Sequence, residues 1–325
     1  MTPFVRRLVV ALLLGVAVYG FFVLYVGVRD LGSSLERFHW SAFALALTLA
    51  TSNYLLRFMK WQYYLRRLDV RGVGVVDSLL VFLSGFVLTI TPGKVGEVFK
   101  SAVLAKTHDV PAERTAPIVV ADRLTDAIGV IILIVVGSGA FAGGLAWAVA
   151  GSIACAFGLL LVVWERPLAV VIAWLEGRGG RMGRIAPKLR VSLASLRVVA
   201  GPAALLWPTA LSVVAWGCEG VALFVLLRGF GAPVPLGVAV FFYSTATLAG
   251  ALIPVPGGLG VAESMIREQL VHLGGVGQGD ATASMILVRF ATLWWAVAVG
   301  FGALALLRLR FPERLGAATP SAERS

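Results

Sequence analysis

The chain has 325 residues, of which 59% are hydrophobic and only 14% charged, and this composition excludes a soluble globular protein. Apolar runs of about 20 residues predict membrane-spanning helices, and the polar stretches between them are too short to build a soluble domain. The net charge of +11 does not indicate nucleic-acid binding, because Lys and Arg are concentrated in particular loops. Two cysteines and three scattered histidines predict no disulfide framework, no metal site and no cofactor.

Six apolar runs predict full membrane spans, at about 8–28, 40–57, 117–141, 145–164, 203–227 and 282–307. The first run is expected to remain as an uncleaved helix, because it is long enough to span a bilayer and no clear cleavage site follows it. The expected fold class is therefore an all-α integral membrane protein, a polytopic helical bundle.

Two further apolar segments, 77–91 and 236–253, are broken by Pro and Gly. Each is followed by a more polar helix, one at 94–106 and one that ends near residue 273. Because these pieces are short for full crossings, we expect two re-entrant helix pairs, the first entering from the cytoplasm and the second from outside. The loop charges alone would equally allow ten full spans.

Basic stretches at 57–71, 165–201 and 308–314 predict cytoplasmic loops, and Arg6 and Arg7 place the N-terminus on the same side. Both termini are then cytoplasmic, and the protein is expected in the cell membrane, inner or plasma. Apolar pieces of the longest connector predict helices that lie in the interface, with a solvated basic linker as the alternative.

The stretch RFMKWQYYLRR, at the end of the second span, carries Arg57, Lys60, Arg66 and Arg67 among aromatic residues. Basic and aromatic residues together are typical of the region where a helix leaves the membrane. We therefore interpret this stretch as a cytoplasmic interface anchor.

The two halves share an order of parts: a span, a broken apolar segment, a Gly-rich tip, a Glu, a polar helix and an Arg-bearing span. From Glu97 to Arg123 the distance is 123 − 97 = 26 residues, and from Glu263 to Arg289 it is 289 − 263 = 26. The predicted topology makes the repeat inverted, and paired broken segments point to a transporter binding site near the midplane. Two units are expected: one membrane domain (1–310) and a disordered cytoplasmic tail (311–325). The membrane domain holds repeat 1 (about 40–142), the basic connector (165–201) and repeat 2 (about 203–307).

The two tips, TPGKVGE at 91–97 and PVPGGLGVAE at 254–263, are expected to end one helix and begin another inside the membrane. Each new helix N-terminus presents free N–H groups and a positive dipole end, and glycine lets an anionic group approach the backbone. A phosphate is the expected guest. The candidate substrate-binding residues are Pro92, Gly93, Lys94, Gly96, Glu97, Lys100, Arg123, Asp126, Glu219, Pro256, Gly257, Gly258, Gly260, Glu263 and Arg289.

Arg289 lies inside its span, where an Arg costs roughly 2.5–3.5 kcal/mol and is expected to face a carboxylate or a phosphate. The alternatives are snorkelling to the near interface and a static ion pair with Glu263. Glu97 and Glu263 are expected either to cap their helices or to hold an Arg that substrate phosphate takes over; proton coupling by such a carboxylate is a further alternative. Glu219 has no obvious partner in the sequence, and Arg289 is one candidate.

Arg123, in VADRLTDAIG, is expected nearer the cytoplasmic edge, with Asp126 as a local helical partner. Lys94 and Lys100 are expected either to receive a headgroup from the cytoplasmic side or to be ordinary interface lysines. No P-loop, dinucleotide turn, nucleophile elbow or His-Glu metal motif is present, so we expect no enzyme activity.

The motifs TPGKVGE, ADRLTD and PVPGGLGVAES…VRF resemble the lysylphosphatidylglycerol synthase transmembrane (flippase-like) family over about residues 5–310. The resemblance implies a multi-pass module that moves lipids or lipid-linked headgroups. Asp122 departs from the pattern, in which Glu is expected before the Arg. The soluble aminoacyl-transferring domain has no counterpart in the sequence, so synthase activity is not implied. The positions that match the family are Pro92, Gly93, Gly96, Glu97, Arg123, Asp126, Pro256, Gly257, Gly258, Gly260, Glu263 and Arg289.

The expected function is translocation of an anionic lipid or a polyprenyl-phosphate-linked lipid through a polar cavity between the two tips, with membrane lipids as partners. One alternative is a small-solute secondary transporter, which would show uptake without lipid movement. The other is a non-transporting partner subunit of a lipid or cell-envelope biosynthetic enzyme. That alternative predicts that Glu97→Gln and Arg289→Ala change nothing if the fold survives.

Overall fold

The computed structural model describes residues 3–90, 96–139, 186–253 and 255–315, with single helical positions at 146, 149 and 153. Every regular element in these ranges is helical, so the expected all-α membrane fold is confirmed. In chain order the elements are α1 (Pro3–Val26), α2 (Val28–Glu36), α3 (Trp40–Arg67), α4 (Val75–Ser84), the 3₁₀ turn η1 (Gly85–Leu88), α5 (Gly96–His108), α6 (Ala112–Thr115), α7 (Pro117–Ser138), α11 (Ala186–Val199), α12 (Pro202–Gly229), α13 (Leu236–Leu252), the 3₁₀ turn η3 (Pro256–Gly258), α14 (Val261–His272), α15 (Gln278–Arg289), the π-helical turn η4 (Phe290–Trp294), α16 (Trp295–Arg310) and α17 (Pro312–Leu315).

Among the described residues, three stretches are long and apolar enough to cross a membrane: Trp40–Arg67, Ala203–Gly229 and Gln278–Arg310, the last of which joins α15, η4 and α16. A fourth candidate is the bent pair of α1 and α2, whose axes differ by 92°. Gly27, with φ 97°, makes this corner in a conformation that favours glycine. The corner ends the first span near the position expected from the sequence and turns the chain into a short helix that the sequence analysis did not predict.

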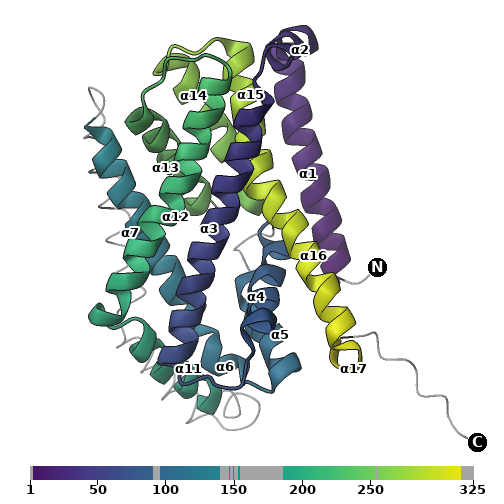
Figure 1. Cartoon of the computed structure of the whole chain (residues 1–325), viewed down its shortest axis with the longest axis vertical. Coiled ribbons are helices and arrows are strands. Elements are labelled where there is room, and N and C mark those ends of the chain that lie inside the picture. The colour runs from purple at the N-terminus through teal and green to yellow at the C-terminus, as the bar shows by residue number, and fades with distance from the viewer. Residues whose placement is uncertain are drawn as a thin grey trace, which may run out of the picture.

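The two broken segments lie in opposite halves of the molecule (Figure 1). In this view α4 and α5 occupy the lower half, and α13 and α14 occupy the upper half. Between them α3 packs most extensively on α12, and these two long helices run in opposite directions. The two broken segments therefore lie toward opposite ends of an antiparallel helix pair, and the inverted repeat itself stays a prediction.

Each half has its own hydrophobic core. One core gathers side chains of α12, α13 and α14, with Leu223 and Phe242 at its centre, and the other gathers side chains of α3, α4 and α5 around Trp61 and Phe82. Lipid tails are as apolar as these side chains, so close packing, and not removal from water, is what stabilises such contacts within a membrane. The cavity described below lies where the two cores meet.

The structure differs from the sequence analysis at two helix ends. α3 does not end at residue 57 but continues to Arg67, because basic side chains within it are paired inside the protein. α17 occupies the start of the segment expected to be a disordered tail, and Arg314 holds it there by an ion pair of 2.7 Å to Asp109. α11, one of the expected connector helices, packs against α6 and α7. The predicted span at 145–164 and the first part of the connector lie outside the described residues, apart from the helical positions at 146, 149 and 153.

Candidate functional site

A cavity lies between the two halves, where both broken segments end. Its volume is about 100 Å³, which accommodates several water molecules or one phosphate-sized group. The first segment contributes η1 and Thr89 to its wall, and the second contributes Gly257 and Gly258. The charged side chains that line it are Arg57, Arg123, Glu219 and Arg289.

The second tip owes its shape to its glycines. Gly257, Gly258 and Gly260 have φ values of 61°, 68° and 85°, a region that side chains disfavour. Gly258 also lies against Gly250 of α13, so that an added Cβ would come within 3.2 Å of the Gly250 backbone. The tip therefore brings the expected residues of the second motif, beginning at Pro256, to one turn beside the cavity.

Glu263 and Arg289 form a buried ion pair at this tip. Arg289 Nε lies 2.6 Å from Glu263 Oε1, and its Nη2 donates to the Gly257 carbonyl at 2.8 Å. The backbone N–H of Gly260 donates to Glu263 Oε2 at 2.8 Å, so the same carboxylate also caps α14. Capping and ion pairing, which the sequence left as alternatives, thus occur together. Arg289 is only 8% exposed and does not reach the interface.

α1, which lies outside the repeat, contacts this ion pair. Tyr19 donates its hydroxyl to Glu263 Oε1 at 3.3 Å, and the indole N–H of Trp294 donates to Tyr19 at 3.0 Å. Nothing in the motif analysis singled out Tyr19 or Trp294. The sequence shows only that Tyr19 is a residue with a polar hydroxyl within a largely apolar run, and this does not identify its partner.

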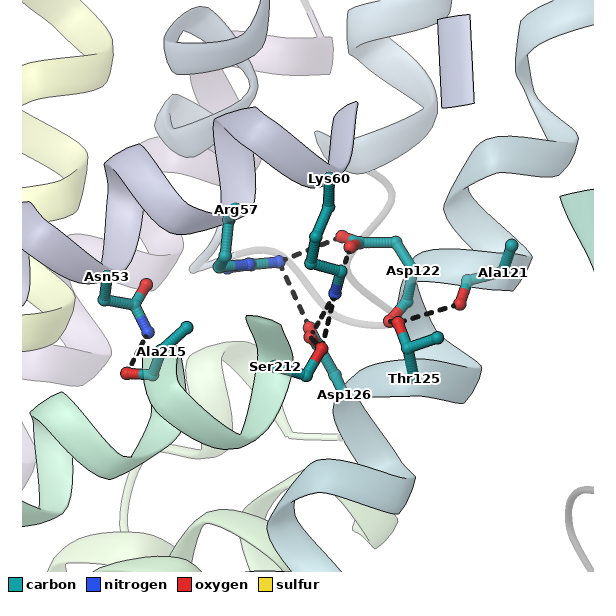
Figure 2. Close-up of polar contacts among 9 residues, drawn as sticks. All are labelled: Asn53, Arg57, Lys60, Ala121, Asp122, Thr125, Asp126, Ser212 and Ala215. Atoms are coloured by element: carbon teal, nitrogen blue, oxygen red, sulfur yellow. Dashed lines mark hydrogen bonds and ion pairs between the residues drawn. The ribbon is translucent and has the colours of Figure 1, made fainter. Parts of the chain in front are cut away.

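A second group of charges joins α3, α7 and α12 (Figure 2). Lys60, which is 0% exposed, places Nζ 2.6 Å from Asp122, 2.7 Å from Asp126 and 2.7 Å from the Ser212 hydroxyl. Arg57 lies 3.2 Å from Asp122 and 3.3 Å from Asp126. Two cations therefore balance two carboxylates in the interior, which is what the cost of burying charge requires.

The interpretation of Arg57 and Lys60 as interface anchors was wrong. Both point into the bundle, because the two carboxylates of α7 offer them partners that lipid cannot. Asp126, which was expected to pair along its own helix with Arg123, binds these two residues of α3. The signal was present in the sequence: charges three apart on one apolar helix and four apart on another predict facing partners.

Close helix contact makes this group possible. An added Cβ at Gly129 of α7 would lie 2.9 Å from the Ser212 Cβ of α12, so only glycine fits without a shift. Nearby, Asn53 Nδ2 donates to the Ala215 carbonyl at 2.8 Å, joining α3 to α12.

Lys100 is neither an interface lysine nor part of the cavity wall. It is 3% exposed, and its ammonium lies 4.9 Å from the Phe82 ring centre and 5.4 Å from that of Trp61. Such cation–π contacts stabilise a desolvated ammonium, which explains how it is buried. Other expected residues of the first motif cannot be placed: Pro92, Gly93 and Lys94, and the side chains of Gly96 and Glu97, lie outside the described part of the chain.

Residues 8–300 match the family described as the lysylphosphatidylglycerol synthase TM region. The chain belongs to this family. A "UPF0104 membrane protein" of Methanothermobacter thermautotrophicus (strain Delta H) is similar to it, with 22% identity over 330 residues that cover 94% of this chain and 97% of that protein. The membership that the motifs suggested is confirmed, and the lysylphosphatidylglycerol synthase TM region spans both halves of the bundle. This establishes a membrane protein of a lipid-related family.

In this family member, Glu219 is the one cavity carboxylate among the described residues. Tyr243 donates to Glu219 Oε2 at 2.6 Å, and Glu219 is 6% exposed. The ion pair with Arg289 considered from the sequence is not formed, because Arg289 is bound to Glu263. No group of three or more His, Cys, Asp or Glu side chains able to hold a metal ion occurs in the described ranges.

The chemistry of the cavity follows from its charges. Three guanidinium groups line it, and a guanidinium is a donor for a phosphate or carboxylate. Arg57 and Arg289 are held in place by carboxylates, and both side chains line the cavity. The arrangement can therefore bind one anionic group in a low-dielectric environment.

Proposed function

We propose that this protein moves the anionic headgroup of a lipid across the membrane through the cavity between its two broken segments. The observation that carries the proposal is the set of three arginines, from both repeats, that converge on one small cavity inside an apolar bundle. Arginine inside a membrane is costly and marks a substrate path more often than a structural need. The volume admits a headgroup phosphate, and acyl tails would remain in the lipid.

The inverted arrangement supports alternating access. We infer that α4 and α5 form one re-entrant pair and α13 and α14 the other, entering from opposite sides. The exposed basic ends of α3 and α16 orient the lower end in Figure 1 toward the cytoplasm of a cell or plasma membrane. Irregular backbone at membrane depth is tolerated where it lines a wet cavity, which fits the tip at Pro256–Gly258. Each tip would then be reached from its own side.

The ion pair at the second tip suggests how a headgroup is held. In the described state, the carboxylate of Glu263 occupies Arg289. A phosphate that enters the cavity offers more acceptor oxygens than a carboxylate, so it competes for the same guanidinium. Glu263 would retain its bond to the Gly260 N–H and return when the phosphate leaves. The exchange keeps Arg289 paired at every stage.

The test is headgroup translocation in proteoliposomes that contain labelled phosphatidylglycerol, phosphatidylethanolamine or a polyprenyl phosphate. Wild type is compared with Arg289→Lys and with Arg289→Gln combined with Glu263→Gln, which leaves no unpaired charge. Arg37→Ala is the matched control, because this arginine is 62% exposed and pairs with Asp280 on the surface. Each variant must show a cooperative thermal unfolding transition, which shows that it is folded.

We expect wild type and the surface control to translocate one anionic lipid at similar rates. Both Arg289 variants should translocate this lipid at least tenfold more slowly than wild type. A protein that takes up a soluble anion without moving any lipid would be a small-solute transporter, and the proposal would be wrong. If folded wild type moves neither a lipid nor a soluble anion, the partner-subunit role is favoured. Co-purification with a lipid or cell-envelope enzyme would then show that role.

A further inference from the structure

We propose that Glu219 binds a proton that travels with the lipid, so that the pH gradient across the membrane drives translocation. This inference rests on the proposed function and adds an energy source to it. It starts from a contrast among the buried carboxylates whose side chains are described. Asp122, Asp126 and Glu263 each lie within 2.7 Å of a cation, whereas Glu219 makes no ion pair with any described residue.

The surroundings of Glu219 favour the neutral acid. The titratable and charged groups that face it are Tyr54 and Arg57 of α3, Arg123 and Asp126 of α7, Tyr243 of α13, Arg289 of α15 and Cys218 of its own helix. Arg57 and Arg289 are already bound to other carboxylates. A carboxylate without a cation inside a membrane is costly, and protonation removes that cost.

Glu219 is nevertheless able to exchange its proton. It lines the cavity, which accommodates several water molecules in its ≈ 100 Å³, and protons move along such waters. The step is a simple protonation: the carboxylate gains one proton from water on one side and returns it on the other, with no change in oxidation state. The Tyr243 hydroxyl, 2.6 Å away, holds the carboxyl group at the cavity wall in both states.

Proton binding also solves an electrostatic problem of the lipid. A phosphodiester headgroup carries one negative charge, and the membrane potential opposes or favours its movement according to direction. When the phosphate crosses together with the proton on Glu219, the two charges cancel and the loaded cavity crosses without net charge movement. The proton leaves with the phosphate, and the cavity returns without either. The phosphate binds to the arginines while the proton binds to Glu219, so both occupy the cavity together.

The test combines a direct measurement of the proton with a transport measurement. Infrared difference spectra between neutral and basic buffer, a range in which exposed carboxylates stay ionised, should show the carbonyl band of a protonated carboxylic acid in wild type. Glu219→Gln should lack this band, and Glu36→Gln, which changes an exposed carboxylate of α2, should retain it. Tyr243→Phe should retain the band at higher frequency, because a hydrogen bond to the carboxyl group is lost.

In proteoliposomes with labelled phosphatidylglycerol and an internal pH dye, a tenfold difference in proton concentration should support up to about tenfold lipid asymmetry. Glu219→Gln should still bind lipid but lose this response, and Glu36→Gln should keep it. Wild-type movement that ignores the gradient would overturn the proton proposal and leave lipid translocation standing. If no lipid moves, the infrared band decides: its presence in wild type and absence in Glu219→Gln supports the proton site, and identical spectra reject it.

Discussion

The charged groups of the two halves are built differently. In the first half, Lys60 and Arg57 share Asp122 and Asp126 in a group that ties three helices together, with Lys60 out of reach of the cavity. In the second half, one ion pair between Glu263 and a cavity-lining arginine connects a glycine tip to α15. The comparison separates two uses of an intramembrane charge: a buried group that holds three helices together, and an ion pair beside the cavity that we propose to be exchangeable.

The largest effect is expected for Lys60→Met, which breaks the lock. It leaves two carboxylates facing one cation in the interior, and breaking a buried pair costs about 3–5 kcal/mol. The melting temperature of the purified protein should fall accordingly. Lys60→Met combined with Asp126→Asn should recover much of the loss, because one cation then faces one carboxylate. A single variant that melts like wild type would contradict the structural role.

A smaller stability effect but a larger functional one is expected for Glu263→Gln. The amide oxygen can still accept from the Gly260 N–H, and water in the cavity can reach Arg289, so we expect a loss of about 1–3 kcal/mol. The rate of headgroup translocation should fall about tenfold, because no carboxylate displaces the phosphate from Arg289 on release. A tenfold change lies within the range of typical coupling free energies. Calorimetry with glycerol phosphate should show tighter binding. A stability loss equal to that of Lys60→Met would mean that the second pair is also a lock.

Gly257→Ala tests the tip without touching a charge. A residue with a Cβ at φ 61° costs about 1–2 kcal/mol, and the nearest atom, the Ile90 Cα at 3.4 Å, adds no clash. Thermal unfolding should show this cost. Gly302→Ala on α16 is the control, because its Cβ would meet nothing within 4 Å and the change should be neutral or stabilise by up to about 1 kcal/mol. Equal melting of both variants would show that the tip tolerates side chains.

The smallest effect is expected for Asp280→Asn, which breaks the surface pair with Arg37. This arginine is 62% exposed, and such pairs contribute about 0–1 kcal/mol. The melting temperature should stay close to that of wild type at both low and high salt. A large change would mean that charge pairs at the bundle ends are as important as those inside, and the contrast between the two halves would lose its meaning.

The all-α class and the positions of the long apolar helices could be predicted from the sequence, whereas the six full spans and the re-entrant pairs stay a prediction, with three to four candidate spans among the described residues. Hydrophobic run length located the long helices, and the Pro-Gly breaks located both interrupted segments, because these features depend on local chemistry. The reach of α3 to Arg67 could not be predicted from run length, because its basic residues resemble those of a membrane interface. Their burial depends on partners that lie 65 residues or more along the chain.

The candidate site could be predicted only in part, because some of its features are local in the sequence and others depend on partners far along the chain. An ion pair with Glu263 was one of the alternatives for an Arg inside a span, and the glycines of PGGLG indicated a special backbone. Tyr243 and Arg57 could not be placed at the cavity, because a helix of uniform hydropathy does not reveal which face meets its neighbour. Side chains that converge from several helices require the packing itself to be known.

The π-helical turn η4 begins directly after Arg289. A π turn holds one residue more than an α turn, so the helix here carries an inserted position within a continuous span. Removing one residue from η4 would restore a regular α-helix and take away the wider turn next to Arg289, while the helix on either side would keep nearly the same rotational register. The wide turn beside Arg289 is thus a property of residue count, and no substitution of a neighbouring side chain would remove it.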